Sequence, residues 1–235
     1  MKVVALIPAA GRGSRMGARE KKPYLSLSGK PILAYTLSEC EKCSLIDEII
    51  LVVSESEIEY SRISIVEAFK FKKVSKIIAG GLKRQDSVWE GLKALKNDYE
   101  LVMVHDGVRP FVSQKILEKS IYETLHYKAT VVAVPVKDTI KIVSKQGEVL
   151  ETIDRSRVWM IQTPQTFKHD ILKKAYEKAI KDGFYGTDDA SLVEKLGIKV
   201  KIIPGFYENI KITTPEDLAL GEVILKRRTS KMHDA

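Results

Sequence analysis

The sequence predicts an α/β fold with a mostly parallel sheet, and two features of its pattern support that prediction. Short runs rich in β-branched residues alternate along the chain with longer stretches of helical periodicity. The short runs are apolar at nearly every position, as in strands that helices cover on both faces. A chain of 235 residues with this pattern is expected to form one large domain, 1–235.

Each expected element follows from its own stretch of sequence. The run VVALIP is apolar throughout and predicts the first strand, and DEIILVV, VSKIIA, LVMVH and TVVAVPV repeat that character. The stretches between them, and those near the end of the chain, carry amphipathic helical patterns. We therefore expect strands at 3–8, 47–53, 74–79, 101–105, 130–136 and 200–205, and helices at 31–42, 56–70, 85–96, 113–126, 169–183 and 215–228.

The α/β alternation is interrupted at 137–157. Two runs of period 2, DTIKIV and EVLETI, flank the turn residues Lys145-Gln146-Gly147, which predicts a β-hairpin. The hairpin has too few apolar residues to fold alone, so we expect it to protrude as an inserted β-arm. A second copy of the chain is its expected partner, which predicts a homodimer.

Composition narrows the function classes. Lys and Arg number 39 against 31 Asp and Glu, so the formal net charge is +8, which fits a nucleic acid, or a nucleotide and a sugar phosphate. Aromatic residues make up only 7% and form no stripe, which argues against nucleic acid. Without a candidate membrane span or signal peptide, a cytoplasmic location is expected.

The two cysteines, Cys40 and Cys43, are spaced C-x-x-C. A zinc site needs further ligands at comparable spacing, and the chain has no second cysteine pair. A redox pair usually begins a helix, whereas these cysteines lie near the expected end of one. We predict two reduced thiols without a catalytic or metal-binding role.

A glycine-rich loop, GRGSRMG, follows the first strand at 11–17. Backbone N–H groups in such loops bind anions, and Arg12, Arg15 and the pair Lys21-Lys22 add positive charge. The loop lacks the Gly-Lys-Ser/Thr of a P-loop, and its third glycine comes one residue late for a dinucleotide fingerprint. The spacing therefore argues against a dinucleotide-dependent reductase.

Two further segments follow strands and are expected at the same edge of the sheet. In HDGVRPFVS, Asp106 is either an acidic group for a metal or a sugar hydroxyl, with Arg109 holding the local structure, or part of an Asp-Gly turn capped by a structural ion pair. In GGLKRQDSV, Gly80 and Gly81 permit a base to approach the backbone, and Ser87 can bond its edge; the simpler alternative is a strand-to-helix turn with a helix start at Asp86 or Ser87.

Two segments nearer the end of the chain carry weaker signals. In YGTDDASLVEKLG, Thr187 precedes two aspartates and an apolar run, which is typical of a helix N-cap. In ENIKITTPEDLALGE, Lys211 is expected in a short strand ahead of a helix, where a lone lysine is ordinarily a solvated surface charge.

The combination of these segments is more specific than any one of them. Over essentially its whole length the chain resembles the 2-C-methyl-D-erythritol 4-phosphate cytidylyltransferases of the non-mevalonate isoprenoid pathway. The matching blocks occur in order at the spacings of that family: PAAGRGSRMG, KKPYLSLSGKPIL, GGLKRQDSV, HDGVRPFVS, VPVKDTIK, TPQTF, TDDASLVE and ENIKITTPEDLALGE.

This resemblance implies a single Rossmann-like nucleotidyltransferase domain that moves a cytidylyl group from CTP to a sugar-alcohol phosphate with the help of Mg²⁺. It implies no nucleic-acid or membrane partner. A ribitol 5-phosphate cytidylyltransferase, from a sister family, remains the alternative. The implied catalytic residues are Arg15, Lys22, Arg155 and Lys211; the CTP-binding residues are Pro8, Ala9, Ala10, Gly11, Gly81, Ser87 and Asp106; the acceptor-binding residues are Asp106, Arg109, Thr139, Arg155, Thr187 and Lys211.

Overall fold

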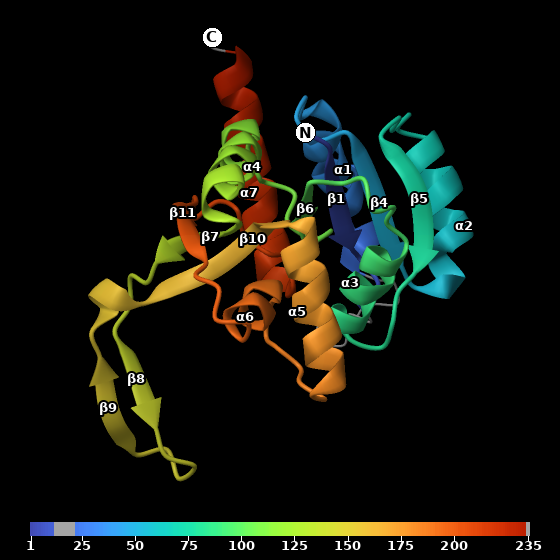
Figure 1. The fold of residues 1–235 in the computed structure, drawn as a ribbon. Coiled ribbons are helices and arrows are strands. Elements are labelled where there is room, and N and C mark those ends of the chain that lie inside the picture. The colour runs from blue at the N-terminus through green and yellow to red at the C-terminus, as the bar shows by residue number, and fades with distance from the viewer. Residues whose placement is uncertain (12–21, 234–235) are drawn as a thin grey trace.

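Seven strands form the main sheet in the part of the chain described by the computed structural model, residues 1–11 and 22–233 (Figure 1). Their order across the sheet is β11-β7-β10-β6-β1-β4-β5. All neighbouring pairs are parallel except the two made by β10, which runs antiparallel to β6 and β7. The strands are β1 (Val3–Pro8), β4 (Glu48–Val53), β5 (Val74–Ala79), β6 (Leu101–Val104), β7 (Ala129–Pro135), β10 (Trp159–Lys168) and β11 (Lys201–Pro204).

Helices cover both faces of this sheet, and the strands divide their side chains between two apolar clusters. In β1, Val3 and Ala5 pack in one cluster while Val4 and Leu6 pack in the other, as the period of a strand requires. Residues of α1 (Ile32–Lys42), α4 (Gln114–Tyr127) and the helical stretch of 55–67, which contains α2 (Ile58–Tyr60), belong to the first cluster. Residues of α3 (Arg84–Lys93), α5 (His169–Lys181) and α6 (Asp189–Glu194) belong to the second.

The last helix, α7 (Pro215–His233), packs over a small hairpin formed by β2 (Ser26–Leu27) and β3 (Lys30–Pro31). Leu27 and Ile224 belong to the third apolar cluster, which joins these elements. At the start of α7 the carboxylate of Asp217 accepts hydrogen bonds from the backbone N–H groups just ahead of the helix. None of the helices among the described residues has the length and apolar composition needed to cross a membrane.

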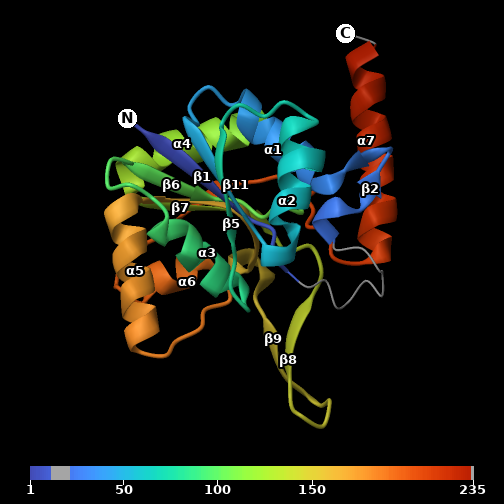
Figure 2. The same cartoon turned by 90° about the vertical axis from the view of Figure 1, so that its right-hand side faces the viewer.

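The predicted hairpin at 137–157 is present, with strands β8 (Ile140–Val143) and β9 (Val149–Ile153). It joins β7 to β10 and extends away from the body of the molecule (Figures 1 and 2). Gly147 adopts φ +87° in its turn, a conformation that glycine reaches without steric cost. Four apolar side chains on these strands are exposed: Ile142, Val143, Val149 and Leu150.

In the main sheet, the sequence did not predict β10, and it did not predict the small hairpin of β2 and β3 either. The middle of β10 contains Pro164 among polar residues, a composition that disfavours a strand. The pairing with β7 is interrupted between Ile161 and Gln165, which accommodates the proline. The buried side-chain amide of Gln162, in β10, has a hydrogen-bond partner, since its Nε2 donates to the carbonyl of Phe206 (2.9 Å).

The predicted short strand at Lys211 is wrong. Lys211 lies in an extended loop ahead of α7, outside every sheet of the described residues. The backbone N–H of Ile212 donates to the carbonyl of Val108 (2.9 Å), which fixes this loop against the segment that follows β6. The two cysteines are free thiols, both buried in the core, as expected.

Candidate functional site

A pocket of about 270 Å³ lies at the carboxyl ends of β1, β5 and β6. The chain runs from β1 to β4 and β5 on one side, and then crosses to β6 on the other side of β1. In open α/β sheets such a change of direction leaves a crevice where ligands bind. The lining residues are Pro8, Ala9, Ala10, Gly11, Lys22, Pro23, Gly81, Leu82, Lys83, Arg84, Ser87, Asp106, Val108, Lys211 and Thr213.

One wall of the pocket is backbone, formed where the loops after β1 and β5 meet. The N–H of Gly80 donates to the carbonyl of Val53 (2.7 Å), and the hydroxyl of Ser54 donates to that of Ala10 (3.2 Å). A Cβ on Gly80 would lie 2.7 Å from both the Cβ of Ala10 and the Oγ of Ser87, closer than such atoms can pack. Glycine at this position therefore permits the two loops to approach each other.

The first turn of α3 completes this wall. The helix begins at Arg84, two or three residues earlier than a start at Asp86 or Ser87, because the carboxylate of Asp86 accepts from the N–H of Lys83 (3.0 Å) and caps it. Ser87 is buried and its hydroxyl donates to the carbonyl of Lys83 (3.1 Å). A Cβ on Gly81 would lie 2.4 Å from the Cβ of Asp86, so this turn too requires glycine.

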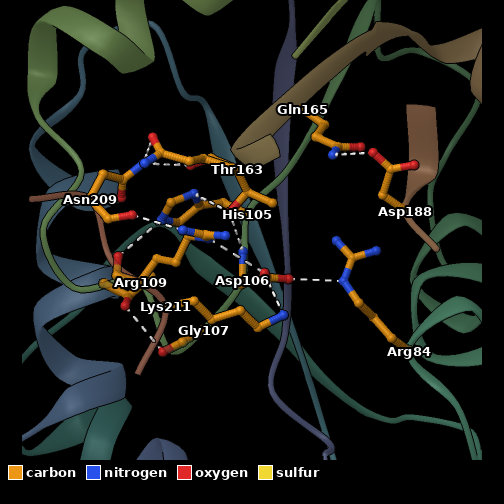
Figure 3. Close-up of polar contacts among 12 residues, drawn as sticks. Arg84, His105, Asp106, Gly107, Arg109, Thr163, Gln165, Asp188, Asn209 and Lys211 are labelled. Carbon is orange, nitrogen blue, oxygen red and sulfur yellow. Dashed lines mark hydrogen bonds and ion pairs between the residues drawn. The ribbon is translucent and has the colours of Figure 1, made fainter. Parts of the chain in front are cut away.

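On the facing side, the Asp106 carboxylate lies among three cationic side chains (Figure 3). Its oxygens lie 2.9 Å from Nε of Arg84, 2.8 Å from Nζ of Lys211 and 3.6 Å from Nε of Arg109. Burial by itself raises the pKa of Asp106, but the three positive charges outweigh burial and hold the pKa well below its ordinary value. The carboxylate is therefore ionised throughout the neutral range.

The loop that carries Asp106 is closed by a buried histidine. His105 Nε2 lies 3.2 Å from the carbonyl oxygen of Arg109, which can only accept, so Nε2 carries the proton. Burial lowers the pKa of His105 to about 4, so the ring is neutral and its Nδ1 accepts from the hydroxyl of Thr163 (3.0 Å). The same hydroxyl oxygen accepts from the N–H of Asp106 (3.0 Å). This chain of bonds fixes the end of β6 to β10.

Arg84, which sequence reasoning missed, joins the pocket to α6. Beside its contact with Asp106, it donates through Nη2 to the carboxylate of Asp189 (2.8 Å). The other oxygen of Asp189, a residue with no exposed surface, accepts from the hydroxyl of Tyr176. The signal was available in GGLKRQDSV, because Arg84 is three residues before Ser87 and so shares its side of the helix.

Lys22 and Lys211 both line the pocket. Lys22 is only 8% exposed, and its Nζ donates to the carbonyl of Thr213 (2.6 Å), on the same loop as Lys211. The loop of 211–213 thus connects the two lysines, and Lys211 connects it to Asp106. An anion placed between the two lysines faces two ammonium groups and the guanidinium of Arg84.

The predicted site residues fall into three groups. Nine of them line the pocket, and Arg109 lies beneath Asp106, where its Nη1 donates to the carbonyl of Asn209 (2.7 Å). Three others lie away from the pocket: Thr139 and Arg155 are exposed on the arm, and Thr187 is exposed ahead of α6. Arg15, with Arg12 and Lys21, lies outside the described residues. The nine are Pro8, Ala9, Ala10, Gly11, Lys22, Gly81, Ser87, Asp106 and Lys211.

Within residues 1–11 and 22–233, no group of three or more His, Cys, Asp or Glu side chains could hold a metal ion. The pocket does present one ionised carboxylate, that of Asp106. A single carboxylate fits Mg²⁺ that is held mostly by the phosphates of a bound nucleotide and by water, and it does not fit a metal held by the protein alone.

Comparisons with known proteins identify the family of this chain. The family model described as 2-C-methyl-D-erythritol 4-phosphate cytidylyltransferase matches residues 3–227. Curated proteins with that name from Syntrophus aciditrophicus and Alkaliphilus metalliredigens are 47% and 50% identical, over 98% and 97% of this chain and 99% and 94% of theirs.

Solved structures are similar as well. The crystal structure of the 4-diphosphocytidyl-2C-methyl-D-erythritol synthase from Anaerococcus prevotii has a TM-score of 0.85 and 38% identity, and covers 96% of both chains. That of the Thermus thermophilus cytidylyltransferase has a TM-score of 0.80 and 29% identity, over 96% of this chain and all of that one. The chain belongs to the 2-C-methyl-D-erythritol 4-phosphate cytidylyltransferase family.

Proposed function

We propose that this protein transfers the cytidylyl group of CTP to 2-C-methyl-D-erythritol 4-phosphate, forming 4-diphosphocytidyl-2-C-methyl-D-erythritol and pyrophosphate. The observation that carries the proposal is the two-sided pocket. A glycine-lined backbone wall faces a side that bears Lys22, Lys211 and Asp106. Such a site suits a flat base on one side and phosphates on the other, and family membership names the nucleotide and the acceptor.

The nucleotide half of the site is the backbone wall. Pro8, Ala9, Ala10 and Gly11 lie along the loop after β1, and Gly81 and Ser87 lie at the start of α3. Backbone N–H and C=O groups in such loops can bond the edge of cytosine, and Ser87 supplies a hydroxyl that donates or accepts. The narrow approach between the loops favours a pyrimidine over a purine.

In the reaction, a 4-phosphate oxygen of the acceptor attacks the α-phosphorus of CTP. The bond from that phosphorus to the bridging oxygen breaks, and pyrophosphate leaves with the electron pair. The attacking phosphate is already an anion, so the site needs no strong general base and acts by positioning and charge stabilisation. We assign that stabilisation to Lys22, whose ammonium lies in the pocket, and to Arg15.

We further propose that the acceptor half is shared between two chains of a homodimer. Asp106 and Lys211, with Arg109 beneath them, serve this half from within the pocket, and Thr187 serves it from the loop ahead of α6. Thr139 and Arg155 stand on an exposed arm with exposed apolar residues, which suits insertion beside a partner's pocket. In this proposal 137–157 is an arm inserted into one domain.

Mg²⁺ is the divalent cation that we propose for this enzyme. When bound, it supplies charge neutralisation on the phosphates of CTP, and the Asp106 carboxylate is the side chain among the described pocket residues that would contact it. Lys211 and Arg84, which hold that carboxylate, keep it ionised and oriented. The predicted cytoplasmic location remains a prediction of the sequence.

Pyrophosphate release in the presence of CTP and Mg²⁺ tests the proposal, with methylerythritol 4-phosphate and ribitol 5-phosphate compared as acceptors. Turnover with methylerythritol phosphate alone is the expected result. Turnover with ribitol phosphate alone would keep the mechanism and contradict the acceptor. Binding of CTP without turnover of either acceptor would contradict the transfer reaction itself.

A further inference from the structure

The segment 184–188, which leads into α6 and contains Thr187, rests against the first turn of α3. It joins α5 to α6 and belongs to neither helix. Gly186 is fitted tightly, since a Cβ there would lie 2.2 Å from the Oγ of Ser191 and 2.9 Å from a methyl group of Leu192. The position of Thr187, the next residue in the chain, therefore depends on the contacts that fix this segment.

Gln85 holds the segment with both ends of its side-chain amide. Its Nε2 donates to the carbonyl of Phe184 (3.0 Å), and its Oε1 accepts from the N–H of Gly186 (2.9 Å). The two bonds flank Tyr185 and fix the backbone on either side of it. Gln85 does not line the pocket, unlike its neighbours Arg84 and Ser87, so it does not contact a ligand there.

Other residues of the same turn contact the same segment. The ammonium of Lys83 lies 3.5 Å from the ring centroid of Tyr185, and Arg84 bonds Asp189 at the start of α6 (2.8 Å). The turn thus contacts the nucleotide pocket with one side and the segment 184–189 with the other.

We infer that Gln85 is a positioning residue for the acceptor: its amide fixes the backbone of residues 184–186 and thereby sets the position of Thr187. This inference rests on the proposed function, in which Thr187 contacts the acceptor. Because Gln85 itself points away from the pocket, its loss should weaken acceptor binding and leave CTP binding in place.

The test is Gln85→Met, which keeps the length of the side chain and removes both hydrogen bonds. We expect KM for methylerythritol 4-phosphate to rise about tenfold, the effect of losing hydrogen bonds of ordinary strength. The dissociation constant of CTP, measured by calorimetry, should change less than about twofold, and kcat should change less than KM for the acceptor. Amide hydrogen exchange at Gly186 should accelerate by a similar factor, since its acceptor is gone.

Gln114→Met is the matched control. Gln114 also begins a helix and donates through its side-chain amide to a backbone carbonyl, that of Glu39 (2.8 Å), away from the pocket lining. It should lose stability as Gln85→Met does, without a selective effect on the acceptor. The inference would be overturned if KM for the acceptor rose equally in both variants. It would also be overturned if the dissociation constant of CTP rose in Gln85→Met as much as KM for the acceptor.

The exchange measurement separates the inference from the proposed function. If the wild-type protein turns over neither acceptor, the proposed function fails, while the Gly186 amide still reports whether Gln85 holds the segment. Unchanged exchange at Gly186 in Gln85→Met would overturn the inference even in an active enzyme.

Discussion

Asp106 is the residue on which the charged side of the pocket depends. It is 5% exposed and forms ion pairs with Arg84, Arg109 and Lys211. Removing one member of a buried ionic group leaves the others uncompensated, which costs far more than an exposed ion pair is worth. The carboxylate is thus a structural requirement of the site as well as a candidate contact for substrate.

Asp106→Asn should lower the free energy of unfolding at pH 7 by about 3 kcal/mol, since Arg109 and Lys211 lose their counter-charge and Arg84 keeps only that of Asp189. The folded-state pKa of Asp106 lies below its unfolded value, so the carboxylate stabilises the fold above about pH 4 and loses that effect as the pH falls further. In urea denaturation, the difference in unfolding free energy between the wild type and Asp106→Asn should stay constant from pH 7 to about pH 4. Between about pH 4 and pH 3 it should shrink. A difference that grows with acidity would contradict the cluster.

His105 should govern stability in a higher pH range. Its pKa falls from 6.5 unfolded to about 4 in the fold, so the unfolded chain takes up a proton that the folded chain refuses. Stability is therefore fully present above pH 6.5 and declines by roughly 3 kcal/mol toward pH 4. In urea denaturation, His105→Gln should reduce the fall in unfolding free energy between pH 6.5 and about pH 4. An equally steep fall in the variant would mean that another group causes it. His169, whose pKa burial also lowers, is present in both proteins and cancels.

Lys22→Ala should lower kcat by about 100- to 1000-fold with a much smaller rise in KM for CTP, as expected when a contact strengthens in the transition state. Single-turnover pyrophosphate release separates this effect from product release. A large rise in KM with kcat preserved would make Lys22 a ground-state binding residue. Its buried position beside Thr213, on the Lys211 loop, is the basis for this prediction.

At the scale of elements, the junction of β5 and α3 determines the width of the nucleotide pocket. Gly80→Ala should raise KM for CTP about tenfold, because the new methyl group meets the Cβ of Ala10 and must separate the two loops. Gly91→Ala, on the same helix, is the control: its methyl group meets only flexible side-chain ends, the nearest being Leu6 at 3.3 Å. Equal changes in KM for CTP in both variants would indicate a general effect on α3.

The elements that the sequence predicted well are those in which each run has one dominant period. The strands β1, β4, β5 and β6 are mostly apolar, so their positions were clear within one or two residues. The strand β10 escaped prediction because its buried residues are polar. Gln162, Thr163 and Gln165 are satisfied by distant partners, which a local pattern does not reveal.

The same limit applies to the site. Strand ends and glycines located most of the pocket, since the carboxyl ends of parallel strands share one edge of the sheet. The role of Arg84 depends on Asp189, which is 105 residues away in the chain. Gln85 likewise binds a segment about 100 residues away, so neither contact could be read from the residues that surround them.

At the scale of the whole molecule, the proposed role of the arm predicts that each active site contains residues of two chains. Arg155→Ala and Arg15→Ala should each be inactive alone, and mixing them should restore about a quarter of the wild-type activity once subunits exchange. Half of the dimers then pair the two variants, and each such dimer has one intact site. The same mixture measured before exchange is the control. No recovery after verified exchange would indicate sites made from a single chain.

The contacts of Asp106 also bear on the order in which the protein is made. Thr163, which fixes the backbone of Asp106, and Lys211 and Asp189, which complete the charged cluster, all follow it by more than 50 residues in the chain. A nascent chain that ends before Thr163 already contains β1, β5 and α3, the backbone wall of the pocket, but lacks these partners. The charged side of the pocket is therefore completed late in synthesis, after the backbone wall has been made.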